Sequence, residues 1–335
     1  MKTLQTAYSI LDLALVSEGN TLKDTFNNVL ELAQNAETFG YTRYWLAEHH
    51  NSTNIGSIAT SVLIGYAAQG TKTIRVGSGG IMLPNHSPLI VAEQFGTLGS
   101  LYPNRIDLGL GRAPGTDRET AEAIRSDFME AAQHFPREIE KIQTYFSKEN
   151  EHANVRATVA EGVEVPLYIL GSSTDSAHLA AKKGLPYAFA SHFATTHLWN
   201  ALAIYREEFQ PSDVLEKPYI IAGVNIIIAE TDEEAANLST SLIRMIVGLF
   251  TGKRDFVQPP TAMTDYYKEI LQNPQVHQML KYSFIGSKAT VKAKVKDFLE
   301  KTQADELIAV TNIYSIKDRV RSYELFAEIM KELNS

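Results

Sequence analysis

The sequence predicts an α/β fold in which eight strands and their connecting helices close into a (β/α)8 TIM barrel. Strand-like and helical patterns alternate along the whole chain, which is typical of parallel sheets with helical crossovers. The chain has 335 residues, more than the roughly 250 that such a barrel needs. We therefore expect residues 1–335 to form a single domain, with insertions after strands 4 and 7.

The expected strands are short runs rich in β-branched and aromatic residues, each bounded by polar or glycine-containing stretches. Eight such units favour a closed barrel over an open doubly wound sheet. The runs are Leu4–Asp12, Arg43–Ala47, Arg75–Gly80, Arg105–Gly111, Leu167–Leu170, Pro186–Ala190, Tyr219–Ala229 and Glu306–Thr311.

Helical patterns, with apolar residues three or four positions apart, fill the intervals between the strands. Gly40, Gly70 and Gly184 each follow such a pattern at the place of a left-handed C-cap, and Thr231 precedes an acidic first turn as an N-cap. The expected helices are Leu22–Phe39, Ile58–Ala68, Leu89–Leu101, Ala177–Lys183, Thr196–Phe209, Asp232–Val247 and Val291–Lys301.

Two intervals, Arg112–Pro166 and Phe250–Ser287, are too long for simple connections. In the first we expect a charged helix over Asp127–Ser147 and a hairpin around Arg156–Val165. Loops that follow the strands of a barrel lie at its catalytic face, so both intervals are candidates for substrate walls or a lid. Surface excursions without a function are the alternative. The second interval contains the aromatic residues Tyr266, Tyr267, Tyr282 and Phe284.

The composition excludes several classes of protein. Because the sequence has no cysteine, disulfide scaffolds, thiolate metal sites and cysteine nucleophiles are excluded. A net charge of −8 argues against nucleic acid and anionic membranes as partners. Asp12 interrupts the apolar run Ile10–Val16, so no signal peptide is expected, and no segment approaches the roughly 20 apolar residues of a membrane helix. We expect a cytoplasmic protein with small-molecule partners.

The segment Tyr41–Asn51 is the first candidate for a catalytic element. Its strand ends in Glu48, His49 and His50, three side chains that can bind or release protons where a barrel strand would open into the mouth. A surface loop with a satisfied histidine pair is the alternative. Because neighbouring strand residues point to opposite faces, and no H-x-H or H-E-x-x-H pattern occurs, we expect no metal site here.

Glycine-rich segments follow the next two strands. The segment Arg75–Pro88 contains Gly77, Gly79 and Gly80, which leave the backbone bare for a flat ligand and permit unusual geometry, even a cis peptide. A tight bulge is the alternative. The segment Arg105–Gly115 lacks the third glycine of a dinucleotide fingerprint. In this segment Arg112 lies just past a strand, where its side chain could bind a phosphate. An ordinary surface arginine is the alternative.

The segment Pro166–Phe193 runs from a strand through Gly171 and a hydroxyl-rich cluster into a helix. Backbone N–H groups and hydroxyls at a helix N-terminus favour a bound anion, and barrels commonly bind phosphate on such loops. A plain N-cap by Ser172 or Ser173 is the alternative. His192 ends the following strand and would point into the same mouth, as a candidate for the substrate pocket.

Taken in order, these segments resemble the bacterial luciferase-like monooxygenase family of flavin-dependent enzymes, most of all its single-chain branch. The resemblance extends from Leu4 to Leu325. The segments that carry it are WLAEHH at 45–50, VGSGGIMLPNHSP at 76–88, GLGRAPG at 109–115, GSS at 171–173, GLPYAF at 184–189 and ELIAVTNIYSIKDRVRSYEL at 306–325. Gly111 stands where luciferase has a reactive cysteine, so light emission is not expected.

The resemblance implies a role for individual residues. His49 would be the catalytic histidine beside the flavin ring, and Gly79 and Gly80 would hold a cis non-proline peptide against that ring. The remaining implied cofactor-binding residues surround the phosphate of flavin mononucleotide (FMN) or adjoin the cofactor: Arg112, Leu170, Gly171, Ser172, Ser173 and Ser176.

The resemblance also implies a reaction and partners. Reduced FMN would serve as a co-substrate with O2, and one oxygen atom would enter a small aldehyde-like or ketone-like substrate. NAD(P)H would act indirectly, through a separate flavin reductase. A homodimer would form on the early helices, where small residues permit close helix approach but equally suit an ordinary core helix: Ala59, Ser61, Gly65 and Ala68.

Three other functions remain open. A deazaflavin-dependent hydride transferase would use the same barrel with a larger cofactor, and binding of the two flavins would distinguish it. A non-catalytic flavin-binding protein would have its mouth blocked by the 250–287 insertion. A zinc hydrolase is the third, and metal analysis of the protein would test it.

Overall fold

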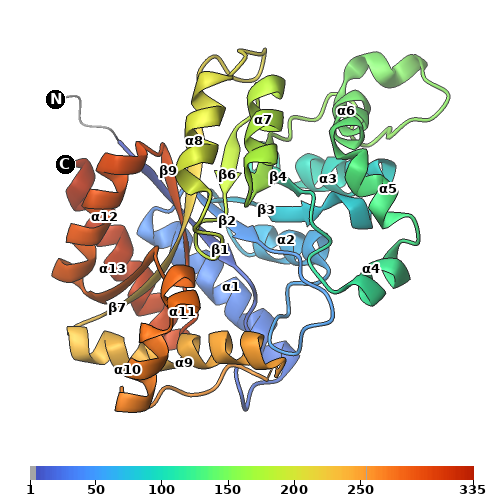
Figure 1. Cartoon of the computed structure of the whole chain (residues 1–335). Coiled ribbons are helices and arrows are strands. Elements are labelled where there is room, and N and C mark those ends of the chain that lie inside the picture. The colour runs from blue at the N-terminus through green and yellow to red at the C-terminus, as the bar shows by residue number, and fades with distance from the viewer. Residues whose placement is uncertain (1–4, 254) are drawn as a thin grey trace.

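The computed structural model describes residues 5–253 and 255–335. Within this part of the chain, eight parallel strands close into a barrel with helices around it (Figure 1). Neighbouring strands pair in chain order from β1 to β7, and β9 pairs with both β7 and β1 to complete the ring. The predicted (β/α)8 barrel is confirmed.

Each of the eight predicted runs overlaps one barrel strand, apart from Leu4, which lies outside the described residues. The barrel strands are β1 (Ala7–Asp12), β2 (Arg43–Leu46), β3 (Arg75–Met82), β4 (Ile106–Gly111), β5 (Leu167–Gly171), β6 (Tyr187–Phe189), β7 (Ile220–Ala229) and β9 (Glu306–Val310).

A further strand, β8 (Ser283–Ser287), lies outside the barrel and was not predicted. All residues of β7 are buried, and its first half pairs with β9 while its second half, Asn225–Ala229, pairs with β8. The long apolar run of β7 therefore extends beyond the ring and needs a second partner strand at its carboxyl end.

The helices that surround the barrel follow the predicted intervals, with ends that differ by a few residues, and α13 is an addition to the predicted set. They are α1 (Leu22–Phe39), α2 (Thr60–Gln69), α3 (Pro88–Leu101), α7 (Thr174–Lys183), α8 (Leu198–Glu207), α9 (Asp232–Thr251), α12 (Lys288–Thr302) and α13 (Ile316–Asn334).

The predicted helix caps are confirmed except at Gly70. Gly40 and Gly184 have φ of 84° and 58°, and the Thr231 hydroxyl accepts a hydrogen bond from the Glu234 N–H. Gly70 has φ of −89°, so it is not a left-handed cap. A Cβ at this position would lie 2.1 Å from Leu30 Cδ1, so this glycine instead lets α1 pack closely.

The first insertion differs from its prediction in two ways. The expected helix over Asp127–Ser147 is two helices, α5 (Phe128–Gln133) and α6 (Phe135–Phe146), because Pro136 lacks an N–H and starts a new helix. The expected hairpin at Arg156–Val165 is wrong, since this stretch forms turns without strands.

The stretch folds as turns because its small side chains pack on a helix of the barrel. Ala157 and Ala160 are buried against Ala92 of α3. A Cβ at Gly96, also in α3, would lie 2.6 Å from Ala160, so the chain and the helix approach without side chains between them. The insertion also contains α4 (Arg118–Ile124) and a short 3-10 turn, Lys148–His152.

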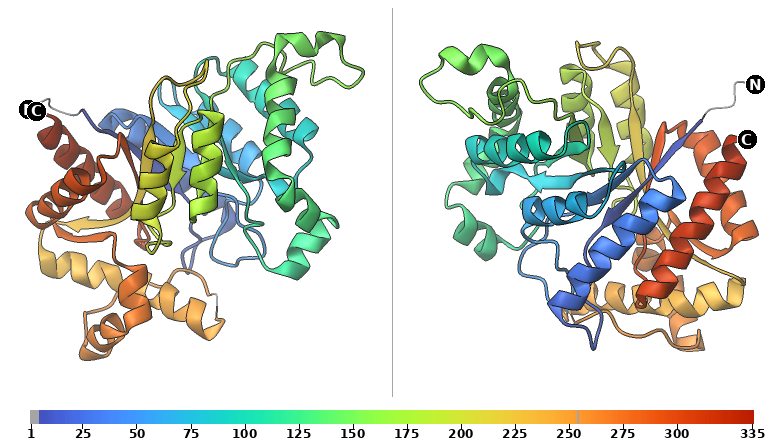
Figure 2. Two further views of the ribbon diagram at one scale, coloured as in Figure 1. Left: turned by 45° about the horizontal axis from the view of Figure 1, so that its top comes forward. Right: turned by 180° about the vertical axis from the view of Figure 1, so that it is seen from behind.

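The late insertion contains α10 (Asp265–Gln272) and α11 (Pro274–Met279). Figure 2 shows the two insertions as separate projections, green for α4–α6 and orange for α10 and α11. Val276 of the late insertion packs into a small apolar cluster with Leu242 and Ile246 of α9 and with Ile313, which follows β9.

The amino-terminal half of the barrel interior is filled by side chains. Arg43 pairs with Asp107 at 2.8 Å and with Glu306 at 2.9 Å, and all three are buried. Above this charged layer, the rings of Trp45 and Tyr168 meet edge to face, with centroids 4.9 Å apart. The packed interior leaves the carboxyl ends of the strands as the place for a site.

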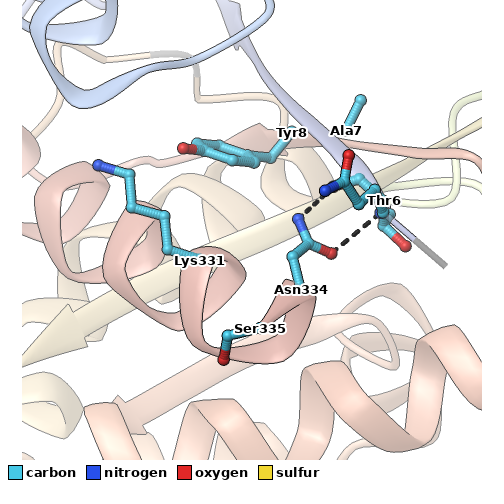
Figure 3. Close-up of a pocket in the computed structure, with 7 residues that line it drawn as sticks. Thr6, Ala7, Tyr8, Lys331, Asn334 and Ser335 are labelled. Carbon is cyan, nitrogen blue, oxygen red and sulfur yellow. Dashed lines mark hydrogen bonds between the residues drawn. The ribbon is translucent and has the colours of Figure 1, made fainter. Parts of the chain in front are cut away.

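A hollow at the opposite, amino end of the barrel lies between β1 and α13 (Figure 3). Asn334 closes it by accepting a hydrogen bond from the Thr6 N–H and donating one to the Thr6 carbonyl, both at 3.0 Å. These bonds fasten the last helix to the first strand, so we interpret the hollow as part of the scaffold.

Among the residues that the structure describes, no helix has the length and apolar character of a membrane span.

Candidate active site

The loop after β2 carries the three predicted ionisable residues, and the structure separates their roles. The Glu48 carboxylate is buried, and His50 Nε2 lies 2.8 Å from it. The His49 backbone N–H donates to the Ser57 carbonyl, and His49 Nδ1 lies 3.4 Å from the Gly115 carbonyl oxygen. The ring of His50 therefore bonds to the Glu48 carboxylate, whereas the ring of His49 lies against the loop after β4.

Glu48 gathers donors from two loops. Its carboxylate accepts hydrogen bonds from the Met82 N–H at 3.0 Å and Asn85 Nδ2 at 3.1 Å, and His86 Nε2 lies 2.9 Å away. Burial raises the pKa of the Glu48 carboxyl, but the bonds from His50 and His86 and from the Met82 N–H outweigh burial and lower the pKa to about 2. Glu48 is therefore ionised.

Sequence reasoning did not select Asn85 or His86 as site residues. Both follow the glycine segment in the short 3-10 turn Leu83–Asn85 and just beyond it. The sequence signal that could have identified them is their position: Asn85 and His86 are polar residues of the segment LPNHSP, directly after a barrel strand.

The glycine segment forms a bare ledge at the end of β3. The peptide bond between Gly79 and Gly80 is cis, as the resemblance implies. A Cβ on Gly79 would lie 2.7 Å from Leu11 Cδ1, and one on Gly80 would lie 2.8 Å from the Gly109 carbonyl oxygen. Leu170 lies beside Gly80, so the structure brings these three predicted cofactor neighbours together.

The predicted anion cradle lies where β5 leads into α7. Ser173 is the N-cap residue of α7, yet its hydroxyl makes no capping hydrogen bond, so the plain N-cap alternative does not hold for this residue. Ser176 Oγ donates to the Ser173 carbonyl at 2.8 Å and lies 3.0 Å from the Tyr187 hydroxyl. Gly171 adjoins them, since a Cβ there would lie 1.7 Å from Ser176 Oγ.

Arg112 reaches the same cradle from the loop after β4. Its Nη2 lies 3.1 Å from Asp175 Oδ2, in the first turn of α7, and both side chains are more than half exposed. The structure therefore brings Arg112 to the first turn of α7, whose N-cap residue is Ser173 and follows Ser172 in the chain. A guanidinium beside free N–H groups and hydroxyls is suited to a phosphate.

His192 lies in the loop after β6, near His49. Its Nδ1 is buried without a hydrogen-bond partner among the described residues. A Cβ on Gly223 would lie 2.5 Å from this atom, so the glycine of β7 makes room for the ring. Burial, together with the charge of His49, lowers the pKa of His192 to about 4, and the ring is neutral at pH 7.

Both insertions contact this end of the barrel, as expected for βα loops. Thr195 and Gln278 exchange hydrogen bonds of 2.7 and 2.8 Å, which fasten α11 to the loop that carries His192. Val257 pairs with Ser17 in the loop after β1. In the first insertion, Asp117 accepts a bond of 3.1 Å from Asn51.

These residues fit a flat ring that carries a phosphate better than a metal ion. Across the described parts of the chain, no three His, Cys, Asp or Glu side chains are arranged to hold a metal. The cis Gly79–Gly80 ledge has no side chain to obstruct a ring, and Arg112 with the uncapped Ser173 offers cation, hydroxyl and N–H donors to a phosphate.

The fold is a (β/α)8 barrel whose candidate site residues lie at the carboxyl ends of its strands. The family model described as luciferase-like monooxygenase matches residues 7–325. The chain belongs to the luciferase-like monooxygenase family. The family identified by resemblance in the sequence is confirmed.

Relatives cover the chain almost completely. A luciferase-like monooxygenase of Escherichia coli (strain K12) is 46% identical, over 98% of each chain. The N-acetyl-S-alkylcysteine monooxygenase of Bacillus subtilis (strain 168) is 32% identical, over 97% of this chain and 95% of the relative. The crystal structure of apo-MsnO8 superposes with a TM-score of 0.89 at 32% identity, over 97% of this chain and 98% of that one.

Two more distant structures share the fold. One is the oxygenating constituent of 3,6-diketocamphane monooxygenase from Pseudomonas putida in complex with FMN, with a TM-score of 0.72 and 16% identity over 96% and 97% of the chains. The other is an F420-dependent secondary alcohol dehydrogenase, with a TM-score of 0.69 and 14% identity over 95% and 97%.

Proposed function

We propose that this protein is a flavin monooxygenase that uses reduced FMN and O2 to oxidise a small organic substrate. The observation that carries the proposal is the meeting, at one end of the barrel, of the Gly79–Gly80 ledge with the cradle of Arg112 and Ser173. Reduced FMN, when bound, supplies the activation of O2 and the transfer of one oxygen atom.

The residues of the chain bind and orient the cofactor and move protons around it. Arg112 and the N-terminus of α7, with Ser172, Ser173 and Ser176, hold the phosphate. The ledge and Leu170 support one face of the ring. His49 donates or accepts a proton beside the ring, because an imidazole changes protonation near neutral pH, and neutral His192 faces the substrate.

The alternative cofactor is a deazaflavin of the F420 type, as in the dehydrogenase that shares this fold. We favour FMN because relatives of 46% and 32% identity are named as monooxygenases, and the activation of O2 is chemistry that a reduced flavin supplies.

We propose a carbonyl compound or a thioether as the substrate. Aldehydes and ketones follow from the family resemblance, and thioethers from the name of the Bacillus subtilis relative. Electrons would come from NAD(P)H in the cytoplasm, through a separate flavin reductase.

We also propose a homodimer on α2 and α3. Both helices expose large apolar side chains: Val62 is 68% exposed, Ile90 46% and Leu101 63%. Exposed apolar side chains that gather on one face mark an interaction surface, and we propose that those of α2 and α3 do so. Sedimentation of the purified protein would show the dimer, and a monomer at all concentrations would contradict it.

Flavin titration tests the proposed function. Purified protein would be titrated with oxidised and reduced FMN and with a deazaflavin, and oxygen uptake would then be measured against aldehydes, ketones and thioethers. We expect FMN to bind more tightly than the deazaflavin, and oxygen consumption to be coupled to substrate oxidation. Preference for the deazaflavin with no oxygen use would establish hydride transfer instead. Binding of FMN without turnover of any substrate would point to a non-catalytic flavin-binding protein.

A further inference from the structure

We propose that Glu48 is the positioning residue of this site. Its carboxylate fastens the loops after β2, β3 and β4 to one another, and so fixes His49 relative to the Gly79–Gly80 ledge. The role in placing the flavin rests on the proposed function, whereas the role in fastening the loops does not.

The first connection runs from β2 to β3. The Met82 N–H, two residues beyond the ledge, donates to Glu48 Oε2 at 3.0 Å. Asn85 Nδ2 and His86 Nε2 bond to the same carboxylate at 3.1 and 2.9 Å. Three groups from a segment of five residues therefore converge on one buried side chain, which holds the chain in place as it leaves the ledge.

The second connection reaches the loop after β4. Asn85 Nδ2 also donates to the Pro114 carbonyl at 2.8 Å. Gly115 accepts a bond from the His50 N–H at 3.3 Å, and its carbonyl oxygen is the neighbour of His49 Nδ1. A Cβ on Gly115 would lie 2.7 Å from the Glu48 carbonyl oxygen, so this loop packs directly on the backbone of Glu48.

Glu48 acts through these neighbours and not on a substrate. An ionised carboxylate has about four acceptor positions, and donors from Met82, Asn85, His50 and His86 occupy them. Its side chain is 1% exposed, so no substrate atom reaches it. Removal of one partner would leave a buried charge or buried donors unpaired, which is the costly change in such a network.

Glu37 offers a matched control. Its carboxylate also collects four donors, from the N–H groups of Lys72, Thr73 and Ile74 and the Thr73 hydroxyl. Burial raises the pKa of Glu37, but these bonds prevail and lower the pKa to about 2. This second carboxylate fastens the chain at the amino end of β3, far along the strand from the ledge.

The test compares Glu48→Gln with Glu37→Gln in the full-length protein. Hydrogen–deuterium exchange would be followed in residues 79–86 and 112–117, and FMN would be titrated while the shape of its visible absorption band is recorded. In Glu48→Gln we expect exchange of 79–86 to rise about tenfold, since a donor replaces an acceptor. We also expect an altered band of bound FMN. Glu37→Gln should change exchange at 72–74 alone and leave the band as in the wild type.

A second pair of variants guards against misfolding of Glu48→Gln. His86 is 27% exposed, so His86→Leu is expected to fold while removing one donor, and it should reproduce part of both changes. His86→Gln keeps an N–H donor and should restore the wild-type band. Unchanged exchange and an unchanged band in Glu48→Gln and His86→Leu would overturn the proposal. If the wild type does not bind FMN, the proposed function fails. The exchange data still test whether Glu48 holds the loops together.

Discussion

Arg112 and Asp175 face each other across the N-terminus of α7, with Nη2 3.1 Å from Oδ2. The pair joins the loop after β4 to the loop after β5 at the place where we put the FMN phosphate. Because both side chains are exposed, the pair itself adds little to stability. Its two members have opposite effects on a bound dianion, which gives two predictions.

Arg112→Ala should weaken FMN binding about 10- to 100-fold, because charge-assisted hydrogen bonds to the phosphate are lost. Fluorescence titration with FMN measures the change. Arg118→Ala is the control, since this arginine is also exposed and pairs with Glu122, and the affinity of this variant should equal that of the wild type. Unchanged affinity in Arg112→Ala would show that the phosphate does not bind beside Arg112.

Asp175→Asn should strengthen FMN binding about two- to fivefold, because Arg112 loses its competing partner and the phosphate loses a like charge. The gain should shrink as salt is added, since the charges are exposed to solvent. Titrations at low and high ionic strength measure both effects. Weaker binding by the variant would mean that Asp175 orders Arg112 and does not compete with the phosphate.

His49→Ala should leave FMN affinity within about threefold of the wild type, because the phosphate cradle is untouched. Turnover should fall about 100-fold or more, as expected when a positioned proton donor or acceptor is removed. Oxygen uptake with an accepted substrate measures turnover. His152→Ala, at an 86% exposed side chain in the first insertion, is the control. Equal turnover in His49→Ala would exclude the histidine from the reaction.

His192 should make the stability of the fold depend on pH. Its pKa is lowered to about 4 by burial and by His49, whereas the unfolded chain binds a proton near pH 6.5. The unfolded state is therefore protonated first as the pH falls. The stability from the neutral ring is complete above about pH 6.5 and is lost between about pH 6.5 and 4.

Urea unfolding at pH 7 and pH 5 measures this contribution. Between these values the wild type should lose on the order of 1 kcal/mol more than His192→Asn, which carries no titrating ring. His152→Asn, at the exposed position, should follow the wild type. The same pH dependence in His192→Asn would show that another group is responsible.

Local patterns predicted the barrel because each strand and helix carries its own periodicity. The run of β7 is apolar apart from Asn225 and was recognised, whereas β8 is five residues long and lies within a polar, proline-containing interval, so it has no comparable pattern.

Long-range contacts could not be predicted in the same way. Glycine is the clearest case. Gly70 follows a helix as a cap would, but its missing side chain leaves room for Leu30, and Gly223 leaves room for the ring of His192. The partners of Glu48 and Arg112 come from other loops, and only the folded barrel brings them into contact.

The last prediction concerns Gly171 and Ser176, because the side chain of Ser176 occupies the space that a side chain at position 171 would need. A Cβ at Gly171 would lie 1.7 Å from Ser176 Oγ and 2.3 Å from Ser176 Cβ. Gly171→Ala should therefore displace the first turn of α7 and weaken FMN binding about tenfold or more, through lost donors to the phosphate. Ser176→Ala cannot relieve the clash, since its Cβ remains, whereas Ser176→Gly removes both atoms.

The double variant Gly171→Ala with Ser176→Gly should thus regain part of the lost FMN affinity, although a glycine within α7 costs about 1 kcal/mol of helix stability. Titration of the two single variants and the double variant forms a complete cycle, with thermal unfolding to record the stability of each. Purely additive losses would mean that the two positions do not share one space, and that the displaced cradle is not the cause of the weakened binding.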